Sequence, residues 1–422
     1  MHQVATTGRG LVAYDSYVDS EQRRRITGTA AALGDVRVAH VNSTASGGGV
    51  AEILDSLVPL SNDVGVDTDW LVMDAPDAFF EVTKTLHNGL QGETAELTDE
   101  MRATYRSVTV ENAEAFAGDY DVVVLHDPQS LGMAPTLVER FPDTALVWRC
   151  HIDLTDATPR FLGFVRSYLD PVDRGIFTLS DYGAAIASVQ KETIHPAINP
   201  LTEKNRPIAE LSEQAAEAAD LGQYPFDTDR PLVVQVSRFD PWKDPLGVIE
   251  AHRRVRETIP GAQLALVGAM PDDDPEGRAI YEEVEAAADD DPDVHVLTNL
   301  PDAGINALQR GADVVVQKSL REGFALTVSE ALWKRTPVVG TTAGGIPLQV
   351  EDGVNGFLDD PEDVEAAADS VVELLESDSL RRRFGEQARE TVRERFLTPR
   401  LLLDYLGVLS SASGVSSPGS ER

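Results

Sequence analysis

Two series of strand-and-helix units constrain the fold of this chain more than any other feature. Short runs of β-branched residues alternate with helical patterns, which is typical of parallel sheets built from β-α-β units. The predicted strands of the first series span 36–42, 70–74, 121–127, 145–151 and 175–180. Those of the second series span 231–237, 263–268, 294–299, 313–319 and 337–342. The pattern predicts an α/β protein with two Rossmann-like, doubly wound domains facing each other across a cleft.

Length also favours two domains, because 422 residues exceed what one hydrophobic core usually organises. We expect an N-terminal domain at 1–210 and a C-terminal domain at 211–395, with the linker within 205–229, where the sequence is acidic and rich in alanine. A helix at 396–411 should pack back on the N-terminal domain. The polar tail at 412–422 is predicted to be disordered.

The charge excludes several classes of partner. The chain has 71 Asp and Glu against 36 Lys and Arg, a net charge of −35, which would repel nucleic acids and anionic membranes. Only six of the 36 basic residues are lysines, and the acidic residues are spread along the chain, which indicates a protein that works in concentrated salt. Small-molecule substrates are therefore the predicted partners, and a homodimer is one assembly that the sequence allows.

The sequence further indicates a cytoplasmic location. A single cysteine, Cys150, rules out an internal disulfide, and the opening residues MHQVATTGRG have neither the basic region nor the apolar core of a signal peptide. No run of about 18 apolar residues, the length that spans a membrane, occurs in the chain.

Open α/β sheets bind ligands at the carboxyl ends of their strands, so the loops that follow the strands are the candidate site. The first such loop is glycine-rich and contains Gly47, Gly48 and Gly49 before a helix. Consecutive glycines let backbone N–H groups approach an anion or a sugar oxygen. The loop is not the G-x-G-x-x-G fingerprint of dinucleotide enzymes, and a flexible turn without a ligand explains it equally well.

The second loop, SRFDPWKDPLG, brings two cations to the start of a helix near Pro245. Arg238 and Lys243 suit a diphosphate, because a guanidinium binds it in a bidentate manner and an ammonium supplies a mobile charge. The alternative is that both cations pair with Asp240 and Asp244 on the surface.

The third loop, REGFALTVSEALW, carries two glutamates, Glu322 after a buried strand and Glu330 in the following helix. Glu322 could accept hydrogen bonds from sugar hydroxyls, and Glu330 could bind both hydroxyls of a ribose. Between them, phosphate oxygens could meet the backbone amides of Gly323, Phe324, Ala325, Leu326 and Thr327. The alternatives are two solvated glutamates, or the carboxylate pair of a glycosidase.

His151 follows a strand of the first series, so it too would lie at the carboxyl end of a sheet, although a lone histidine is more often structural. Cys150 beside it is better explained as a small buried residue than as a nucleophile. The acidic runs at 272–274 and 289–291 are interpreted as solvated surface, and no metal site is predicted.

These motifs resemble those of retaining glycosyltransferases with the GT-B fold, whose E-x7-E signature matches Glu322 and Glu330. Within that group the chain is similar to the trehalose glycosyltransferring synthases from about residue 36 to 358, through HVNSTASGGGVAEIL, HDPQ, WRCHIDL, SRFDPWKDPLGVI, ALVGAMPDDDPEG, QKSLREGFALTVSEALWK and GGIPLQV. The resemblance implies that the C-terminal domain binds the nucleotide sugar and that the N-terminal domain is the acceptor side.

Residue roles also follow from this resemblance. Glu330 would hold the ribose of the donor, Arg238 and Lys243 its diphosphate, and Glu322 with the following amides its glucose, with His151 near the donor sugar. The Gly47–Gly49 loop would form the other wall of the cleft. The implied reaction moves glucose from ADP- or UDP-glucose to free glucose and forms α,α-trehalose.

No residue is an obvious nucleophile for double displacement, so we favour front-face attack, with the cations replacing a divalent metal and with no cofactor. Two other readings remain open. A trehalose phosphorylase of the same fold would use glucose 1-phosphate. A nucleotide-sugar epimerase, or a non-catalytic sensor of nucleotide sugars, would bind the donor without transferring its glucose to an acceptor.

Overall fold

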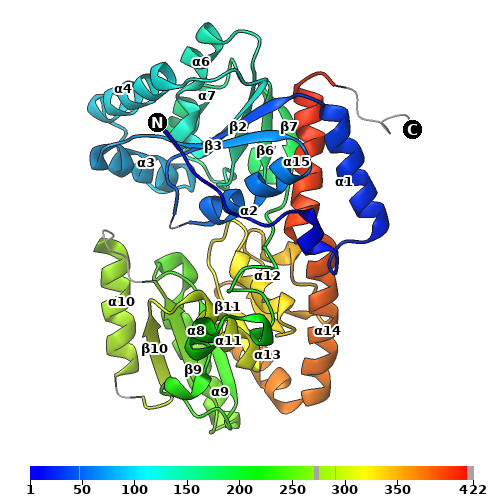
Figure 1. Cartoon of the computed structure of the whole chain (residues 1–422). Coiled ribbons are helices and arrows are strands. Elements are labelled where there is room, and N and C mark those ends of the chain that lie inside the picture. Colours follow the sequence, from blue (N-terminus) through cyan, green and yellow to red (C-terminus); the bar gives the residue numbers. More distant parts are fainter. Residues whose placement is uncertain (47, 270–274, 290, 416–422) are drawn as a thin grey trace. The chain divides into compact units, whose positions relative to one another are not determined.

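The structure, a computed structural model, describes residues 1–46, 48–269, 275–289 and 291–415 of the chain (Figure 1). Two compact units make up the chain. Unit 1 comprises Met1–Ala197 and Thr398–Arg422, and unit 2 comprises Ile198–Leu397. Each unit is built on one sheet with helices packed against it, which is the α/β architecture expected from the alternating pattern.

Unit 1 contains a seven-stranded sheet in the order β1-β3-β2-β4-β5-β6-β7. All its strand pairs are parallel except β1 with β3. The bounds of its strands are β1 His2–Gln3, β2 Arg37–Asn42, β3 Asp67–Val72, β4 Val122–His126, β5 Ala145–Cys150, β6 Arg174–Phe177 and β7 Gln190–Thr193. Every residue of β4 is buried, as expected for a central parallel strand that is covered on both faces.

The helices of unit 1 follow the strands and bury their apolar sides on the sheet. Their bounds are η1 Leu11–Tyr14, α1 Ser20–Leu33, α2 Gly49–Asp63, α3 Asp77–Leu90, α4 Asp99–Ala115, α5 Asp127–Leu131, α6 Ala134–Arg140, α7 Pro159–Arg166, η2 Asp181–Gly183 and α15 Thr398–Ala412. The last of these, α15, follows unit 2 in the sequence but belongs to unit 1. It lies beside α1 and also contacts α2 (Figure 1).

Unit 2 contains a six-stranded, fully parallel sheet in the order β10-β9-β8-β11-β12-β13. Its strands are β8 Leu232–Val236, β9 Gln263–Gly268, β10 Val294–Thr298, β11 Val314–Gln317, β12 Val338–Thr341 and β13 Gly356–Asp359. Its helices are η3 Ile208–Glu210, α8 Glu213–Ala218, η4 Leu221–Gln223, η5 Pro241–Lys243, α9 Pro245–Thr258, α10 Pro275–Ala288, α11 Asp302–Gly311, α12 Leu326–Trp333, η6 Ile346–Leu348, α13 Val364–Glu376 and α14 Asp378–Arg395.

Every strand predicted from the sequence is present, with ends shifted by a few residues. The strands that the sequence did not predict are β1, β7 and β13. They lack a buried apolar run: β1 is fully exposed, β7 reads QKET, and β13 is only partly buried. Pairing with a neighbouring strand, rather than local composition, holds them in the sheets.

The division between the units lies at Ala197, earlier than the boundary expected at residue 210. The stretch 205–229 is not a free linker, because its short helices belong to unit 2, where Ala215 and Ala219 pack against Ala303 and Ala307 of α11. Small alanine side chains allow this close packing. The alanine-rich stretch that suggested a linker therefore packs against α11 within unit 2. The tail expected at 412–422 lies outside the described residues from 416 onwards, and Ala412 is the last residue of α15.

Candidate functional site

The loops after the neighbouring strands β8 and β11 meet through a cation and a carboxylate in unit 2. Nζ of Lys243 lies 2.6 Å from Oε2 of Glu322, and both side chains are largely buried. The hydroxyl of Ser319 donates to the same carboxylate oxygen at 3.3 Å. The backbone N–H of Leu320 donates to the carbonyl of Trp242 at 2.8 Å, which ties the two loops together. Two residues predicted for the site, 79 positions apart, are thus in direct contact.

The surface alternative for the two cations holds for Arg238 but not for Lys243. Arg238 is exposed and its Nη2 lies 3.1 Å from Oδ2 of Asp240. Asp244, the other expected partner, is engaged by the buried Lys318, and its Oδ1 accepts the N–H of Gly247 at the start of α9. Because Asp244 forms its ion pair with Lys318, the ammonium of Lys243 pairs with Glu322 instead.

The turn that starts α12 is held in a strained shape. Ala325, its N-cap, has φ of 66° and ψ of 77°, a left-handed conformation that is uncommon for a residue with a Cβ. A Cβ on Gly345 would stand 2.8 Å from Cα of Phe324, so only glycine lets the two segments approach. The amide of Gln349 donates to the carbonyl of Phe324 and its oxygen accepts the hydroxyl of Ser329. The GGIPLQV segment therefore clamps the predicted donor loop 323–327.

Glu330 is buried, with a side chain only 2 % exposed, so it is not a solvated glutamate on a helix. Its Oε1 lies 3.5 Å from Nζ of Lys204. Its Oε2 has no hydrogen-bond partner among the residues that the structure describes. At Lys334, the residue that follows α12, burial lowers the pKa to about 7, although the charge of Glu330 acts in the opposite direction.

The glycine-rich loop of unit 1 follows β2 and leads into α2, as predicted. Asn42, at the end of the strand, donates to the carbonyl of Thr44 at 2.6 Å and accepts the indole N–H of Trp70 at 2.7 Å. Helix α2 begins at Gly49, and its N-cap Gly48 provides no side-chain cap. Gly47 lies outside the described residues.

His151 lies at the end of a row of three histidines in unit 1. Nδ1 of His40, on β2, lies 2.9 Å from Nε2 of His126, at the end of β4. Nδ1 of His126 lies 3.3 Å from Nε2 of His151, which follows β5. We refer to His40, His126 and His151 as the histidine row. Because β2, β4 and β5 are adjacent, the ring of His40 within β2 reaches that of His126 at the end of β4, which reaches that of His151 after β5.

Burial governs the ionisation of this region. It lowers the pKa of His40 to about 3, and it lowers the pKa values of His126 and His151 well below the usual value, with the charge of Arg149 adding to the effect on both. Burial also raises the pKa of Asp127 to about 6, although its Oδ1 accepts the N–H of His151 at 2.7 Å. The three rings are therefore neutral at pH 7.

Cys150 is buried, and burial raises the pKa of its thiol well above the usual value, which fits a structural residue. Among the described residues no cluster of three or more His, Cys, Asp or Glu side chains could hold a metal ion. The acidic run at 289–291 is not all solvated, because Asp291 accepts two hydrogen bonds from Arg256, at 2.6 and 2.8 Å. The run at 272–274 lies outside the described residues.

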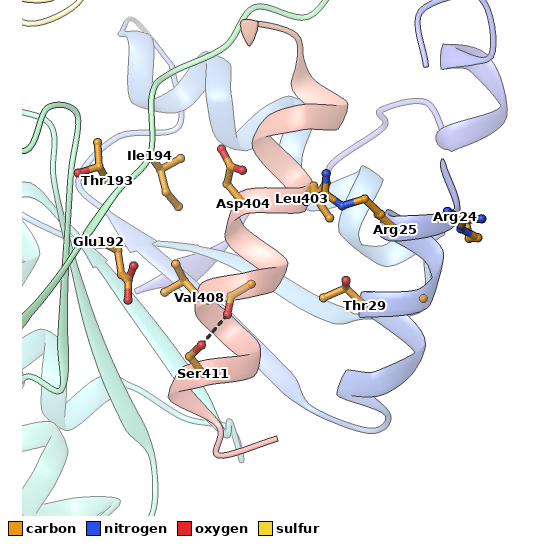
Figure 2. Close-up of a pocket in the computed structure, with 12 residues that line it drawn as sticks. Arg24, Arg25, Thr29, Glu192, Thr193, Ile194, Leu403, Asp404, Val408 and Ser411 are labelled. Carbon is orange, nitrogen blue, oxygen red and sulfur yellow. Dashed lines mark hydrogen bonds between the residues drawn. The ribbon is translucent and has the colours of Figure 1, made fainter. Parts of the chain in front are cut away.

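A cavity of about 670 Å³ lies elsewhere in unit 1, between α1 and α15 beside the end of β7. Figure 2 shows Thr29 on α1, and Leu403 and Val408 on α15, among the residues that line it. Its lining contains none of the described residues that the sequence predicted for the site, and its arginines, Arg24 and Arg25, are exposed. The strand-end loops, rather than this cavity, concentrate the buried ionisable groups, so we place the candidate site there.

Several site residues escaped sequence analysis because they are polar groups whose partners are distant in sequence. These are His40, His126, Asp127, Arg149, Lys204, Lys318 and Lys334. The HDPQ motif, which begins at the last residue of β4, contained two of them, but nothing in the motif indicated which neighbours they contact. In the part of the chain that the structure describes, no helix is long and apolar enough to cross a membrane.

Comparison with known proteins identifies both units. The family model of the trehalose synthase N-terminal domain matches residues 40–184, and that of glycosyl transferases group 1 matches residues 217–391. The trehalose synthase of Thermococcus litoralis is 42 % identical over 410 residues, covering 96 % of this chain and 97 % of that protein. A trehalose phosphorylase of Pleurotus pulmonarius is 28 % identical, over 85 % of this chain but only 54 % of that protein.

The fold is that of the GT-B glycosyltransferases. The structure of a sucrose-phosphate synthase from Thermosynechococcus elongatus matches with a TM-score of 0.70, covering 90 % of this chain and 100 % of that chain. The sequence identity in this match is only 19 %, so the likeness concerns the fold alone.

Proposed function

The chain belongs to the trehalose synthase family of glycosyltransferases, and from this premise we propose that it transfers glucose from a nucleoside diphosphate glucose to free glucose, forming α,α-trehalose. The observation that carries the proposal is the contact between Lys243 and Glu322 at 2.6 Å. This contact places a cation that can stabilise a leaving phosphate beside a carboxylate that can bind sugar hydroxyls, in the loops that follow two neighbouring strands.

In this proposal Glu322 binds the glucose of the donor and Lys243 binds its diphosphate. A carboxylate has about four lone-pair sites, so Glu322 can hold Lys243 and still accept a hydrogen bond from a glucose hydroxyl. Lys243 then stands between the sugar and the diphosphate, where negative charge grows as the donor bond breaks. Arg238, exposed and weakly held by Asp240, is able to turn to the diphosphate.

Glu330 supports a nucleoside in the donor. A buried carboxylate oxygen without a hydrogen bond is costly, and Oε2 of Glu330 is such an atom among the described residues. The two hydroxyls of a ribose would supply donors to it. Glucose 1-phosphate, the donor of a phosphorylase, has no ribose and would leave this oxygen without a partner.

The chemistry in this proposal retains the anomeric configuration. The bond from C1 of glucose to the phosphate oxygen breaks, and a bond from C1 to the acceptor oxygen forms on the same face. The acceptor proton passes to the leaving phosphate oxygen, so no side chain has to act as a base. The ammonium of Lys243 and the N-terminal end of α12 stabilise the diphosphate without a divalent metal.

One assay tests the proposal. The protein is incubated in molar KCl and a chelator with ADP-glucose or UDP-glucose plus glucose, and the products are identified by NMR. We expect α,α-trehalose and one nucleoside diphosphate per disaccharide. Product formation only with glucose 1-phosphate would replace the proposal with the phosphorylase, which the more distant relative represents. Donor binding without any disaccharide would instead indicate a sensor or an epimerase.

A further inference from the structure

A second cavity, of about 310 Å³, lies in unit 2, and we call it the basic cavity. Five of the residues that line it are cations, namely Arg310, Lys334, Arg335, Arg381 and Arg382. Among the described residues, two carboxylates line it as well, those of Asp313 and Glu386. The chain as a whole has the opposite balance, with 71 acidic against 36 basic residues, so this excess of positive charge is a local feature.

The basic cavity lies at the amino ends of β11 and β12. Asp313 directly precedes β11 and Pro337 directly precedes β12, and both line the cavity. Because the strands of this sheet are parallel, their amino ends lie at the edge opposite the loops that carry Lys243 and Glu322. A ligand in the basic cavity would therefore not be the diphosphate of the proposed sugar donor.

Three of the five cations have a structural explanation within unit 2. Nη2 of Arg381 lies 3.3 Å from Oδ1 of Asp313. Arg310 and Lys334 lie at the C-terminal ends of α11 and α12, where a positive charge stabilises the helix dipole. Nζ of Lys334 also donates to Oε1 of Gln309 at 2.6 Å. These three side chains form part of the wall of the cavity whether or not a ligand is bound.

Arg335 and Arg382 are not explained in this way. Both are exposed, and neither guanidinium has an ion pair or a hydrogen bond among the described residues. Glu386 lies one turn after Arg382 on α14, yet no ion pair joins the two among these residues. A single exposed arginine without a partner is ordinary, but these two line one cavity together with three other cations.

The backbone of Arg335 has a conformation that arginine seldom adopts. Its φ of 66° lies in the left-handed region, at the position after a helix C-cap where glycine is common. Helices α12 and α14 pack side by side (Figure 1), and a Cβ on Gly385 would collide with the carbonyl oxygen of Arg335. This close approach brings Arg335 and Arg382 to the same cavity. A strained position that carries an arginine rather than a glycine indicates a function for the guanidinium.

We propose that the basic cavity binds a phosphate group, either as free phosphate or as the phosphate of a sugar ester. A guanidinium donates two parallel hydrogen bonds to phosphate oxygens, and Arg335 and Arg382 have guanidinium groups that can do so. The negative charge of the phosphate would offset the local excess of cations. The volume of about 310 Å³ lies at the lower end of the range for small-ligand pockets, about 300–1,000 Å³, so the cavity suits a small ligand. The inference goes beyond the proposed function and does not depend on it.

Calorimetric titration of the full chain in molar KCl, without any sugar donor, tests the proposal. Inorganic phosphate is the first ligand and glucose 6-phosphate is the second. We expect saturable binding of at least one of them. Tighter binding of glucose 6-phosphate would assign the cavity to a sugar ester, and equal or tighter binding of inorganic phosphate would assign it to the free ion. No saturable binding of either ligand to the wild type would overturn the proposal.

Two variants remove the unpaired cations without disturbing the fold. Arg335→Asn keeps the left-handed turn, because asparagine tolerates that conformation, and Arg382→Gln keeps a good helix former on α14. We expect the dissociation constant of the bound ligand to rise about tenfold in each variant, as for the loss of hydrogen bonds to a charged group. An unchanged dissociation constant in both variants would overturn the proposal.

Arg383→Gln is the matched control. Arg383 is the next arginine of α14 and is also exposed, but it does not line the cavity, and its guanidinium carbon lies 5.5 Å from the ring centroid of Phe384. Its dissociation constant should stay within about twofold of the wild type, because molar salt screens a charge outside the cavity over about 3 Å. An equal weakening in Arg383→Gln would show a general charge effect and would contradict the proposal.

Lys243→Ala separates the basic cavity from the donor site, because it removes the cation proposed to bind the diphosphate. We expect this variant to bind the ligand as the wild type does. Loss of binding in Lys243→Ala, with normal binding in Arg335→Asn and Arg382→Gln, would place the phosphate at the donor site and overturn the proposal. If the wild type makes no trehalose, the proposed function fails, and these titrations still decide the inference.

Discussion

The pH dependence of unit 1 stability provides the sharpest test of the buried histidines. The pKa of His40 is lowered from 6.5 to about 3 in the folded chain. A group with a depressed folded pKa contributes stability that is fully present above its unfolded pKa and is lost as pH falls towards the folded pKa. Between pH 6.5 and about 3, the unfolded chain therefore takes up a proton that the folded chain excludes.

The magnitude follows from the difference in proton binding. One pKa unit corresponds to about 1.4 kcal/mol, so 1.5 pH units below 6.5 cost about 2 kcal/mol from His40 at pH 5. His126 and His151 shift in the same direction. Asp127 opposes them, because its pKa is raised to about 6 and its protonation at pH 5 regains about 1.4 kcal/mol. The stability lost through the three histidines exceeds the stability regained through Asp127, so we expect unit 1 to be less stable at pH 5 than at pH 7.

The His40→Asn variant isolates the contribution of His40 to the pH dependence of unit 1 stability. The free energy of unfolding of unit 1 should fall less between pH 7 and pH 5 in the variant than in the wild type, by about 2 kcal/mol. A urea titration at constant ionic strength, read by pulsed hydrogen exchange of peptides from β2 and β4, reports unit 1 separately from unit 2. An identical loss in variant and wild type would refute the reasoning. In His252→Asn, by contrast, the pH dependence should change only in unit 2, where the pKa of His252 is lowered to about 4.

Four further predictions concern the donor site and the charge. Glu330→Gln should raise the KM for the nucleotide sugar roughly ten- to hundredfold, because a hydrogen bond to a charged group is lost, and an unchanged KM would remove Glu330 from the site. Lys243→Ala should lower kcat on the order of 10²–10³-fold, with Lys191→Ala as the unaffected control. A chelator should leave wild-type kcat unchanged, and abolished activity would contradict the cationic site. The melting temperature should fall in dilute buffer, because the Debye length grows from about 3 Å at 1 M salt to about 10 Å at 0.1 M; a constant value would refute this.

The sheets could be predicted from the sequence because their signal is local. A short run of β-branched residues such as VVVLH in β4 indicates, by its composition and length, a strand that is buried on both faces of a parallel sheet. Strand β7, with the residues QKET, has no such signal and forms only because β6 offers free backbone groups at its edge. The packing of α8 against α11 is likewise a tertiary contact, and its alanines looked like a linker when taken alone.

The candidate site was predictable only where one short motif carried it. REGF followed by a helix places Glu322 at a strand end, and SRFDPWK does the same for Lys243, but their contact depends on β8 and β11 being neighbours. The histidine row was not predictable for the same reason. His40 and His126 are 86 residues apart, and only the strand order brings their rings together.

Lysine content was a signal that the sequence analysis used only to infer a salt-rich environment and not to locate the candidate site. The chain has six lysines among its 36 basic residues, and four of them lie in unit 2 with buried or largely buried side chains: Lys204, Lys243, Lys318 and Lys334. Lys318 reaches the carboxylate of Asp244 and the carbonyl of Pro361, and Lys334 reaches the side-chain oxygens of Asn205 and Gln309. These acceptors diverge around a single atom, which suits a compact ammonium with three donors and not a planar guanidinium. In an acidic chain that otherwise uses arginine, a lysine therefore marks a place where the geometry of the neighbours, rather than the net charge, determines the cation.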